Sequence, residues 1–308
     1  MKRFILPFLL LCLLLSGCSE KSAQQTVFAM NTVMELQVWG ADSEAAVAEL
    51  QSTLYTLESQ WSATREDSIL SAINRGQSIP TDPEQTQLLQ AVEQLSWRTE
   101  GAFDPGLYAV SRLWDFTGEA PHVPPEDQLK HALTREQWDL GGALKGYAGQ
   151  KCAQLLAGMD VQRAILNLGG NIQTFGEKPN GSPWQVGIQN PDGGDYLGIL
   201  SVSGTASIVT SGDYQRYFEE NGVRYHHILD PETGYPASSG LRSVTVICRD
   251  GLTADALSTA LFVMGLERGI SFWQESNDFE AVFITVDGKI HATEGALLSG
   301  CQYEVISR

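Results

Sequence analysis

The spacing of apolar residues predicts two helices within the first hundred positions. Between residues 47 and 61 the apolar side chains follow at intervals of three and four. That is the period of an amphipathic helix, which Asp42 or Ser43 would cap. Asp82-Pro83 opens a second helix, because proline suits the first helical position. The apolar positions are Val47, Leu50, Leu54, Leu57 and Trp61 in the first helix, and Leu88, Leu89, Val92 and Leu95 in the second. These stripes indicate core packing and carry no chemistry.

Short β segments replace this pattern in the second half of the chain. The predicted strands cover residues 164–168, 184–189, 197–202, 206–210, 223–228 and 243–248. Residues 27–39 predict a bent strand or a strand pair, Asp287-Gly288 predicts a hairpin turn, and a final helix is predicted over about 253–265. Because runs of helices precede runs of strands, we predict an α+β fold. No clear linker divides the chain, so any second domain would be interleaved with the first.

Charge and cysteine content exclude some classes of protein. The 308 residues include 20 Lys and Arg against 37 Asp and Glu, which gives a formal net charge of −17. This balance argues against nucleic acid as a partner, because non-specific binding needs a basic face. Any phosphate site must therefore be built locally. Five dispersed cysteines are too few for a disulfide scaffold. They are Cys12, Cys18, Cys152, Cys248 and Cys301.

The N-terminus has the features of a signal peptide. Lys2 and Arg3 form a basic start, and residues 4–15 form an apolar run that is shorter than the about 20 residues of a spanning helix. The run ends in Leu-Ser-Gly-Cys18, which looks like a bacterial lipobox. In signals of this kind Cys18 becomes the lipidated first residue. An ordinary cleaved signal peptide with an incidental cysteine is the alternative.

These features predict a lipid-anchored protein outside the cytoplasmic membrane, on the periplasmic face or the cell surface. The predicted parts are a lipoprotein signal peptide over 1–17, a short tether over 18–26 and a folded domain over 27–308.

Several common catalytic motifs are missing from the sequence. It contains no GxxxxGK[ST] phosphate loop, no HExxH, no GxSxG, no CxxC and no GxGxxG. Four less common segments remain as candidates, and two of them are rich in glycine. Residues 139–148 (DLGGALKGYA) let the backbone approach a ligand, although a helix-entry turn with a solvated Lys145 is the alternative. Residues 167–171 (NLGGN) mark a bulge, a close backbone contact or a structural turn.

The third segment carries two adjacent histidines. Residues 210–214 (TSGDY) are followed by residues 224–236, in which His226 and His227 precede an Asp-Pro-x-Thr-Gly turn. Neighbouring residues of a strand point to opposite faces, so only one of the two can face a given pocket. A histidine with a pKa near neutrality is a natural proton acceptor. Two half-exposed strand histidines without a catalytic role are the alternative.

The fourth segment places oxygen ligands on one side of a helix. Asp255, Ser258 and Thr259 occupy positions i, i+3 and i+4, so they share a face. Such ligands suit Mg²⁺, for which substrate phosphates supply the remaining oxygens. Alternatively, Asp255 only complements the dipole at the helix N-terminus.

Taken together, these segments resemble the ApbE family, whose members are flavin transferases that use FAD as the FMN donor for protein flavinylation. The matches keep the family order from Met30 to Gly265, nearly the whole mature chain. They are Met30-Asn31-Thr32, Trp61-Ser62 to Ser68, Gly101-Ala102-Phe103-Asp104-Pro105 and the four segments above. The resemblance implies a T-fold-like mixed sheet with flanking helices. The lipobox agrees with it, since many members are exported lipoproteins.

The resemblance also implies an activity and a site. FMN would move from FAD to a Thr or Ser hydroxyl of an acceptor flavoprotein, with release of AMP. Mg²⁺ would be held by the Gly142 carbonyl, Asp255, Ser258 and Thr259. His227 is the implied base, with Asp255 as a competitor for that role. The implied flavin and adenine contacts are Met30, Ala102, Phe103, Asp104, Asp139, Lys145 and Ile228.

Three departures from the family pattern bear on this reading. Asn31 stands where glycine is usual, His226 replaces a serine, and residues 106–108 differ from the common stretch. Two rival functions use the same residues. With water in place of the acceptor, the site would hydrolyse FAD to FMN and AMP. A lipoprotein that only captures flavin is the other rival, but a carrier needs neither a metal-ligand face nor a placed histidine.

Overall fold

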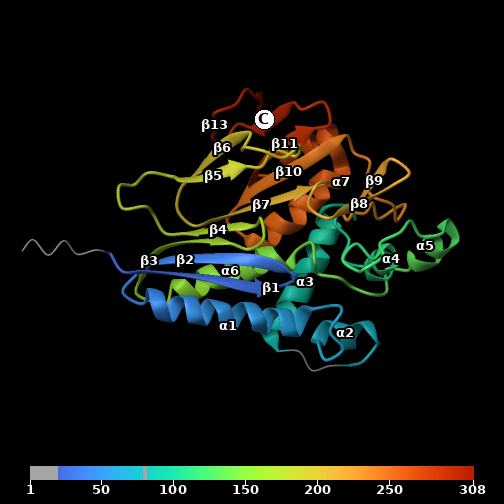
Figure 1. Cartoon of the computed structure of the whole chain (residues 1–308), viewed down its shortest axis with the longest axis horizontal. Coiled ribbons are helices and arrows are strands. Elements are labelled where there is room, and N and C mark those ends of the chain that lie inside the picture. Colours follow the sequence, from blue (N-terminus) through green and yellow to red (C-terminus); the bar gives the residue numbers. More distant parts are fainter. Residues whose placement is uncertain (1–19, 79–81) are drawn as a thin grey trace, which may run out of the picture.

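A large mixed sheet forms the centre of the computed structural model, which describes residues 20–78 and 82–308 (Figure 1). Its strands are, in their order across the sheet, β1 (Ser22–Ala29), β2 (Thr32–Gly40), β3 (Val161–Asn167), β4 (Ile172–Phe175), β7 (Ala206–Gly212), β10 (Leu241–Cys248), β11 (Phe279–Thr285), β12 (Ile290–Thr293) and β14 (Glu304–Ile306). Neighbouring strands are antiparallel, except that β12 and β14 run parallel. The sheet therefore joins the N-terminal and C-terminal parts of the described chain.

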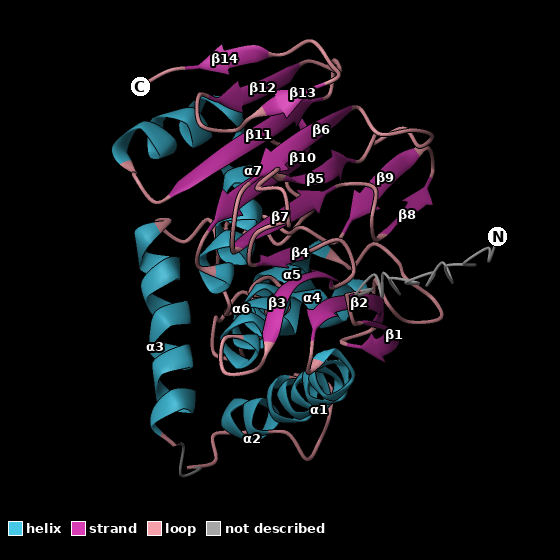
Figure 2. Ribbon diagram, turned by 90° about the vertical axis from the view of Figure 1, so that its left-hand side faces the viewer, coloured by secondary structure: helices cyan, strands magenta, loops and turns pink. Residues whose placement is uncertain are grey.

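Helices cover one face of this sheet. They are α1 (Ser43–Trp61), α6 (Leu144–Leu156) and α7 (Gly251–Glu275). The helix α2 (Ile69–Asn74) packs against α1, and α3 (Pro83–Arg98) packs against α7. Helix α1 lies on β1 and β2, α6 lies on β4 and β7, and α7 lies on β7, β10 and β11. Figure 2 shows α3 standing at the side of this layer. Two apolar cores result, one beneath α1 and α6 and the other beneath α7.

A small sheet covers part of the opposite face. It consists of β5 (Trp184–Ile188), β6 (Gly198–Val202) and β13 (Leu298–Ser299). Its apolar side chains pack with Ile208, Val282 and Ile284 of the large sheet in a third core. Since Val209 of the same strand belongs to the core beneath α7, β7 is apolar on both faces. This double burial fixes the strand that leads to residues 210–214.

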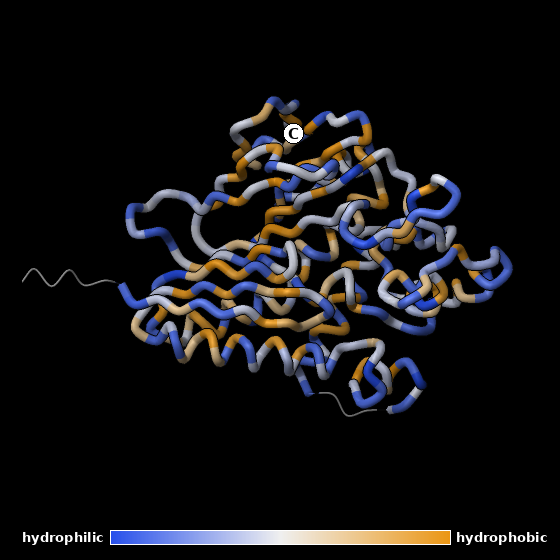
Figure 3. The backbone as a smooth tube through the Cα atoms, viewed as in Figure 1, coloured by the Kyte–Doolittle hydropathy of each residue, from blue (hydrophilic) through white to orange (hydrophobic). Residues whose placement is uncertain are grey.

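A peripheral module lies at one end of the molecule. It contains α4 (Tyr108–Trp114), α5 (Glu126–Ala132), and the hairpin of β8 (Tyr217–Glu220) and β9 (Val223–His226). Val110, Trp114, Leu129 and Leu229 form its own small core. Figure 3 shows polar residues concentrated in its outer loops, with apolar residues on the elements that face inward.

The structure confirms the predicted α+β class and several elements. Helix α3 begins with a full capping box. The Asp82 carboxylate accepts from the Gln85 N–H, and the Gln85 side-chain oxygen accepts from the Asp82 N–H. The residue 27–39 region is a strand pair. The turn at Gly288, with φ of +80°, joins β11 to β12 as predicted.

Other expectations were wrong. The segment predicted as a tether forms β1 from Ser22 onward, because its residues pair with β2 along their whole length. The last helix does not end at Gly265. That residue adopts φ 79° and ψ 179°, which kinks α7, and the helix continues to Glu275. The short helices α2, α4 and α5 were not predicted, because fewer than two full turns give no readable period.

The predicted lipobox and Cys18 lie outside the described residues. Within residues 20–78 and 82–308, no helix is both long and apolar enough to cross a membrane. The three cysteines in this part, Cys152, Cys248 and Cys301, are free thiols, and the first two are buried. Burial raises the pKa of Cys152 to about 12, as expected for a small apolar core residue.

Candidate active site

The site is built where α6 and α7 touch backbone to backbone. A Cβ added to Gly146 would lie 2.0 Å from the carbonyl oxygen of Gly251, and one added to Gly251 would lie 2.2 Å from that of Gly146. Only glycine at both positions permits this approach. As a result, Asp255 reaches the start of α6. Its Oδ2 accepts a hydrogen bond from the Gly146 N–H at 2.8 Å, and its side chain is only 3% exposed.

Hydroxyl groups gather beside this carboxylate. Ser258 Oγ donates to the Asp255 carbonyl oxygen at 2.8 Å and lies 2.8 Å from Ser211 Oγ at the end of β7. Ser211 Oγ is also 3.4 Å from Thr259 Oγ1. A Cβ on Gly142 would lie 3.4 Å from Thr259 Oγ1, so the loop before α6 lies next to these hydroxyl groups. The structure thus brings together all four predicted magnesium ligands, and adds Ser211.

This donor set fits Mg²⁺ only with help from a substrate. In the described part of the chain, no three His, Cys, Asp or Glu side chains come together as a metal site. The group offers one carboxylate and several hydroxyls, all of them hard oxygen ligands, and the Gly142 backbone lies beside them. Mg²⁺ is commonly held by one or two carboxylates together with phosphate oxygens and water. The residues therefore fit a magnesium ion shared with a phosphate-bearing ligand.

The entry of α6 carries two further predicted residues. Asp139 Oδ1 accepts from the Gly141 N–H at 2.8 Å, which holds the glycine turn. Burial raises the pKa of Asp139, whereas the charges of Arg216 and Lys145 act in the opposite direction. Lys145 forms no ion pair with the described residues. It is therefore a cation available to an anionic ligand.

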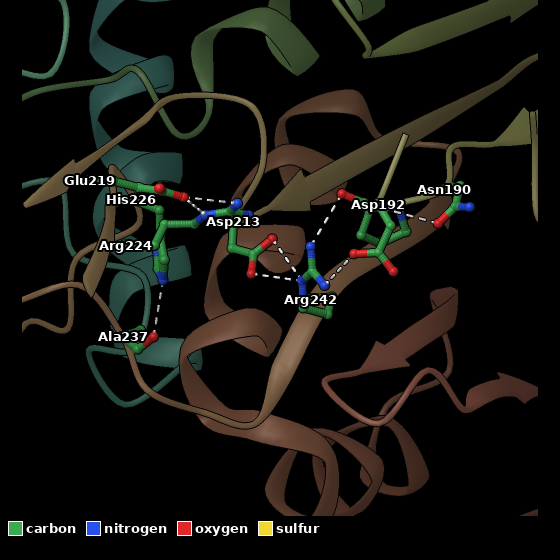
Figure 4. Close-up of polar contacts among 9 residues, drawn as sticks. Asn190, Asp192, Asp213, Glu219, Arg224, His226, Ala237 and Arg242 are labelled. Atoms are coloured by element: carbon green, nitrogen blue, oxygen red, sulfur yellow. Dashed lines mark hydrogen bonds and ion pairs between the residues drawn. The ribbon is translucent and has the colours of Figure 1, made fainter. Parts of the chain in front are cut away.

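The two histidines make different contacts, as expected for neighbouring residues whose side chains point to opposite faces of a strand. His226 is buried, its Nε2 lies 3.1 Å from the Ala237 carbonyl oxygen, and its Nδ1 accepts from the Ile228 N–H at 3.3 Å. These two hydrogen bonds hold the loop that follows β9, and Figure 4 shows the one between His226 and Ala237. His227 Nδ1 lies 3.3 Å from the Arg216 carbonyl oxygen. Its environment is shaped by Arg216 and Lys145, so His227 is the member of the pair that faces the site.

His227 is neutral at physiological pH. Burial, followed by the positive charges of Arg216 and Lys145, lowers the pKa of His227 to about 3. Burial also lowers the pKa of His226. A neutral imidazole has a free lone pair and can accept a proton from a hydroxyl. Protonation of His227 becomes easier once an anion offsets the two nearby cations.

The loop at residues 101–106 approaches the same glycine turn through Phe103. The buried Phe103 ring lies 3.4 Å from where a Gly142 Cβ would stand. Asp104 is engaged elsewhere: its Oδ1 accepts from the Gly106 N–H at 2.7 Å and its Oδ2 lies 3.1 Å from Arg135 Nε. Asp104 and Arg135 line a cavity of about 480 Å³ at the end of α3. Asp104 therefore shapes its loop rather than presenting a free carboxylate.

Met30 occupies the tight turn between β1 and β2. Met30 and Asn31 have φ of 51° and 57°, and the Met30 N–H donates to Glu58 Oε1 at 2.9 Å. Asparagine tolerates this left-handed conformation better than most residues, so Asn31 keeps a turn for which glycine is usual. Thr32 of this turn contacts Gly169, where a Cβ would lie 2.4 Å from Thr32 Oγ1. The turn thus abuts the predicted NLGGN segment.

Residues 210–214 contribute both ligands and scaffold. Ser211 joins the hydroxyl group, whereas the Asp213 carboxylate lies 2.9 Å from Arg242 Nε. Figure 4 shows Arg242 also bound to Asp192. Arg242 Nη2 donates to the Pro191 carbonyl oxygen as well. Arg242 therefore bridges Asp213, which follows β7, and the loop after β5.

Two polar residues that the sequence analysis did not single out also belong to this region. Arg216 acts electrostatically on both Asp139 and His227. Asn171 is 4% exposed, and its Nδ2 has no hydrogen-bond partner among the residues that the structure describes. The NLGGN segment was a signal for Asn171, but nothing in the linear sequence shows that Arg216 lies opposite His227.

These features define an α+β domain with a cluster of polar side chains at the crossing of two helices. The sequence model of the ApbE family matches residues 30–283, and the chain belongs to that family. It is 36% identical over 293 residues to a FAD:protein FMN transferase of Treponema pallidum, covering 83% of this chain and 81% of the relative. It is 34% identical over 311 residues to one of Vibrio cholerae, covering 90% and 92% of the two chains.

Solved structures agree with this assignment. The ApbE protein of Thermotoga maritima superimposes with a TM-score of 0.83 at 31% identity, covering 89% of this chain and 97% of that one. The flavin transferase ApbE of Vibrio cholerae superimposes with a TM-score of 0.79 at 28% identity, covering 89% and 98%. The predicted mixed sheet with flanking helices is therefore confirmed.

Proposed function

We propose that this chain is a FAD:protein FMN transferase that attaches FMN to a Thr or Ser hydroxyl of an acceptor flavoprotein and releases AMP. Membership of the ApbE family and the names of its relatives support the transferase activity. The hydroxyl acceptor, the release of AMP and the dependence on Mg²⁺ are our inferences. The observation that carries them is the buried Asp255 among hydroxyl groups, with neutral His227 and the unpaired Lys145 nearby.

Mg²⁺ would be held by Asp255, Thr259, Ser258 and the Gly142 carbonyl oxygen. When bound, it would neutralise charge on the FAD phosphates and make the phosphorus easier to attack. Asp255 suits this role because the Gly146 N–H engages only one of its oxygens.

The chain's own residues would orient the substrate and move one proton. The neutral His227 would accept the proton of the acceptor hydroxyl. Lys145 would attract the pyrophosphate, which a protein of net charge −17 cannot do at long range. The proposed flavin and adenine contacts are Met30, Ala102, Phe103, Asp104, Asp139, Lys145 and Ile228. Of these, Asp104 would act through the shape of its loop, since its carboxylate is already engaged.

Intact-mass spectrometry tests this function. The purified protein is mixed with FAD, Mg²⁺ and a flavin-acceptor domain, with a chelator in the matched control. We expect a metal-dependent FMN adduct on the acceptor together with an equal amount of AMP. Free FMN and AMP without an adduct would replace the proposal with FAD hydrolysis. Bound FAD without either product would make the protein a carrier.

We also propose that Cys18 is lipidated and that the protein is anchored outside the cytoplasmic membrane. The support is the lipobox-like sequence. Strand β1 begins only four residues after Cys18, so such an anchor would hold the domain close to the bilayer. Cell fractionation tests this: the native chain is expected with membranes, and C18A in the soluble fraction or unprocessed. Equal membrane association of both chains, with C18A processed to the same length as the native chain, would exclude the anchor.

A further inference from the structure

The β8–β9 hairpin sets two side chains next to each other at its open end. Its turn is Asn221-Gly222, with φ of 52° and 78°, and Glu220 pairs with Val223 on either side. A two-residue turn with positive φ at both positions fixes the register of the whole hairpin. The pairing continues through Phe218 with Tyr225.

This register extends one step beyond the strands. The His227 N–H donates to the Arg216 carbonyl oxygen at 3.1 Å, so Arg216 and His227 form the next pair. Side chains of directly opposed residues in an antiparallel ladder leave from the same face, with Cβ atoms about 5 Å apart. Arg216 therefore projects on the same face as His227. Arg224 lies at an alternate position and belongs to the other face.

A rigid support holds this face. Phe218 and Tyr225 stack with ring centroids 5.3 Å apart, and both rings contact the buried Trp114. Trp114 Nε1 donates to the Gly234 carbonyl oxygen at 2.8 Å, which ties α4 to the loop after His227. The Arg216–His227 pair is thus presented from a fixed platform.

Arg216 differs from neighbouring arginines in its partners. Arg224 pairs with Glu219 and covers the Tyr217 ring, and Arg242 pairs with Asp213 and Asp192. Within residues 20–78 and 82–308, no carboxylate oxygen lies within ion-pair distance of the Arg216 guanidinium. Its charge nevertheless acts on Asp139 and His227, as that of Lys145 does. A half-buried arginine without an anion beside a second free cation points to an anionic ligand.

We propose that Arg216 binds the pyrophosphate of FAD and stabilises the charge that passes to AMP during transfer. This inference rests on the proposed function. The acceptor oxygen forms a bond to the FMN phosphorus, and the bond from that phosphorus to the bridging oxygen breaks. The bridging oxygen leaves with the bonding electron pair as part of AMP, and the acceptor proton passes to His227. A guanidinium beside this oxygen neutralises charge as it develops.

Kinetics of matched variants test the assignment. In R216Q, kcat is expected to fall by about 10²-fold, by more than KM rises, because the charge is needed most as the bond breaks. R216K should recover only part of this loss, since an ammonium lacks the two-pronged geometry of guanidinium. R224Q removes an arginine from the opposite face of the same hairpin and should keep the activity of the native chain. A kcat for R216Q within threefold of the native value would overturn the catalytic role.

A binding measurement keeps this test separate from that of the proposed function. The affinities of FAD and of riboflavin, which lacks phosphate, are compared by fluorescence quenching in the native chain, R216Q and R224Q. We expect R216Q to weaken FAD binding at least about tenfold and to leave riboflavin unchanged. Equal loss for both ligands, or no loss for FAD, would overturn the pyrophosphate contact. This result stands whether or not the native chain transfers FMN.

Discussion

The two halves of the candidate site are held together in different ways. On the α6–α7 side, main chain touches main chain at Gly146 and Gly251, and Asp255 is fixed by a backbone N–H. On the hairpin side, a main-chain hydrogen bond joins His227 to Arg216, but the hairpin itself rests on side chains, through the stack of Phe218 and Tyr225 on Trp114. The difference suggests that the first half tolerates almost no added volume, whereas the second fails when a large side chain is removed.

The largest effect is expected at Asp255. D255N should reduce FMN transfer by about 10³-fold, because an amide cannot supply the negative charge that Mg²⁺ requires, and its oxygen can still accept from Gly146 N–H so that the fold is kept. D250N is the matched control, since asparagine caps α7 as well as aspartate does. Transfer assays with the acceptor domain measure both. Activity of D255N within tenfold of the native chain would remove Asp255 from the site.

Removal of Trp114 should cost the most stability. W114A leaves a large void under the hairpin and is expected to lower the free energy of unfolding by about 4 kcal/mol. W97A is the control, because Trp97 is 70% exposed and its loss should change the value by less than about 0.5 kcal/mol. Urea unfolding measures the two. A similar small change in both would show that the aromatic cluster does not support the hairpin.

Added volume tests the other half. G146A places a Cβ against the Gly251 carbonyl oxygen and should lower the free energy of unfolding by about 3 kcal/mol. At Gly158 a Cβ would stand 3.5 Å from the nearest atom, the Leu155 carbonyl oxygen, so G158A should be nearly neutral. Thermal unfolding compares them. An unchanged stability of G146A would mean that α6 and α7 can move apart at this point. In that case the close contact between the two helices does not fix the position of Asp255.

The last prediction concerns pH. The pKa of His227 is about 3 in the folded chain and near 6.5 when unfolded, so between these values protons bind the unfolded chain preferentially. Stability should therefore decline as pH falls from 6.5 towards 3, and H227Q should show a shallower decline. Urea unfolding at pH 7, 6, 5 and 4 measures the slopes. Parallel slopes for the two proteins would contradict a neutral His227 in the folded chain.

The sequence predicted the parts of the fold that have a clear period. Helices α1 and α3 followed from their apolar stripes, α3 also from its cap, and the hairpin at Gly288 from its turn residues. The predicted cap of α1 was wrong, because the Asp42 carboxylate accepts from the Asp160 N–H and makes no capping hydrogen bond. The first half of strand β1 was missed because it is polar, as suits an edge strand with one open side. The kink at Gly265 was taken for a helix end, since one glycine looks the same in both cases.

The candidate site shows a similar division. Asp255, Ser258 and Thr259 were found from helical spacing, because their relation is local. The roles of Ser211 and Arg216 were not predicted. Ser211 lies beside Ser258 of α7, and Arg216 lies opposite His227 because of the register of the hairpin, so both neighbours are distant in the sequence. Linear sequence alone does not state which strand residues oppose one another. Asp104 shows the opposite case: the motif marked it, but its carboxylate is engaged with Gly106 and Arg135.

The central claim is that the α7 carboxylate and the hairpin histidine act in one site. Transfer rates of D255N, H227Q and the double variant test it most directly. If both residues serve the same step, the double variant should be no more than about tenfold slower than the slower single variant. Once one of the two residues is removed, the other can no longer contribute fully to that step. A double variant whose loss equals the product of the two single losses would contradict the claim.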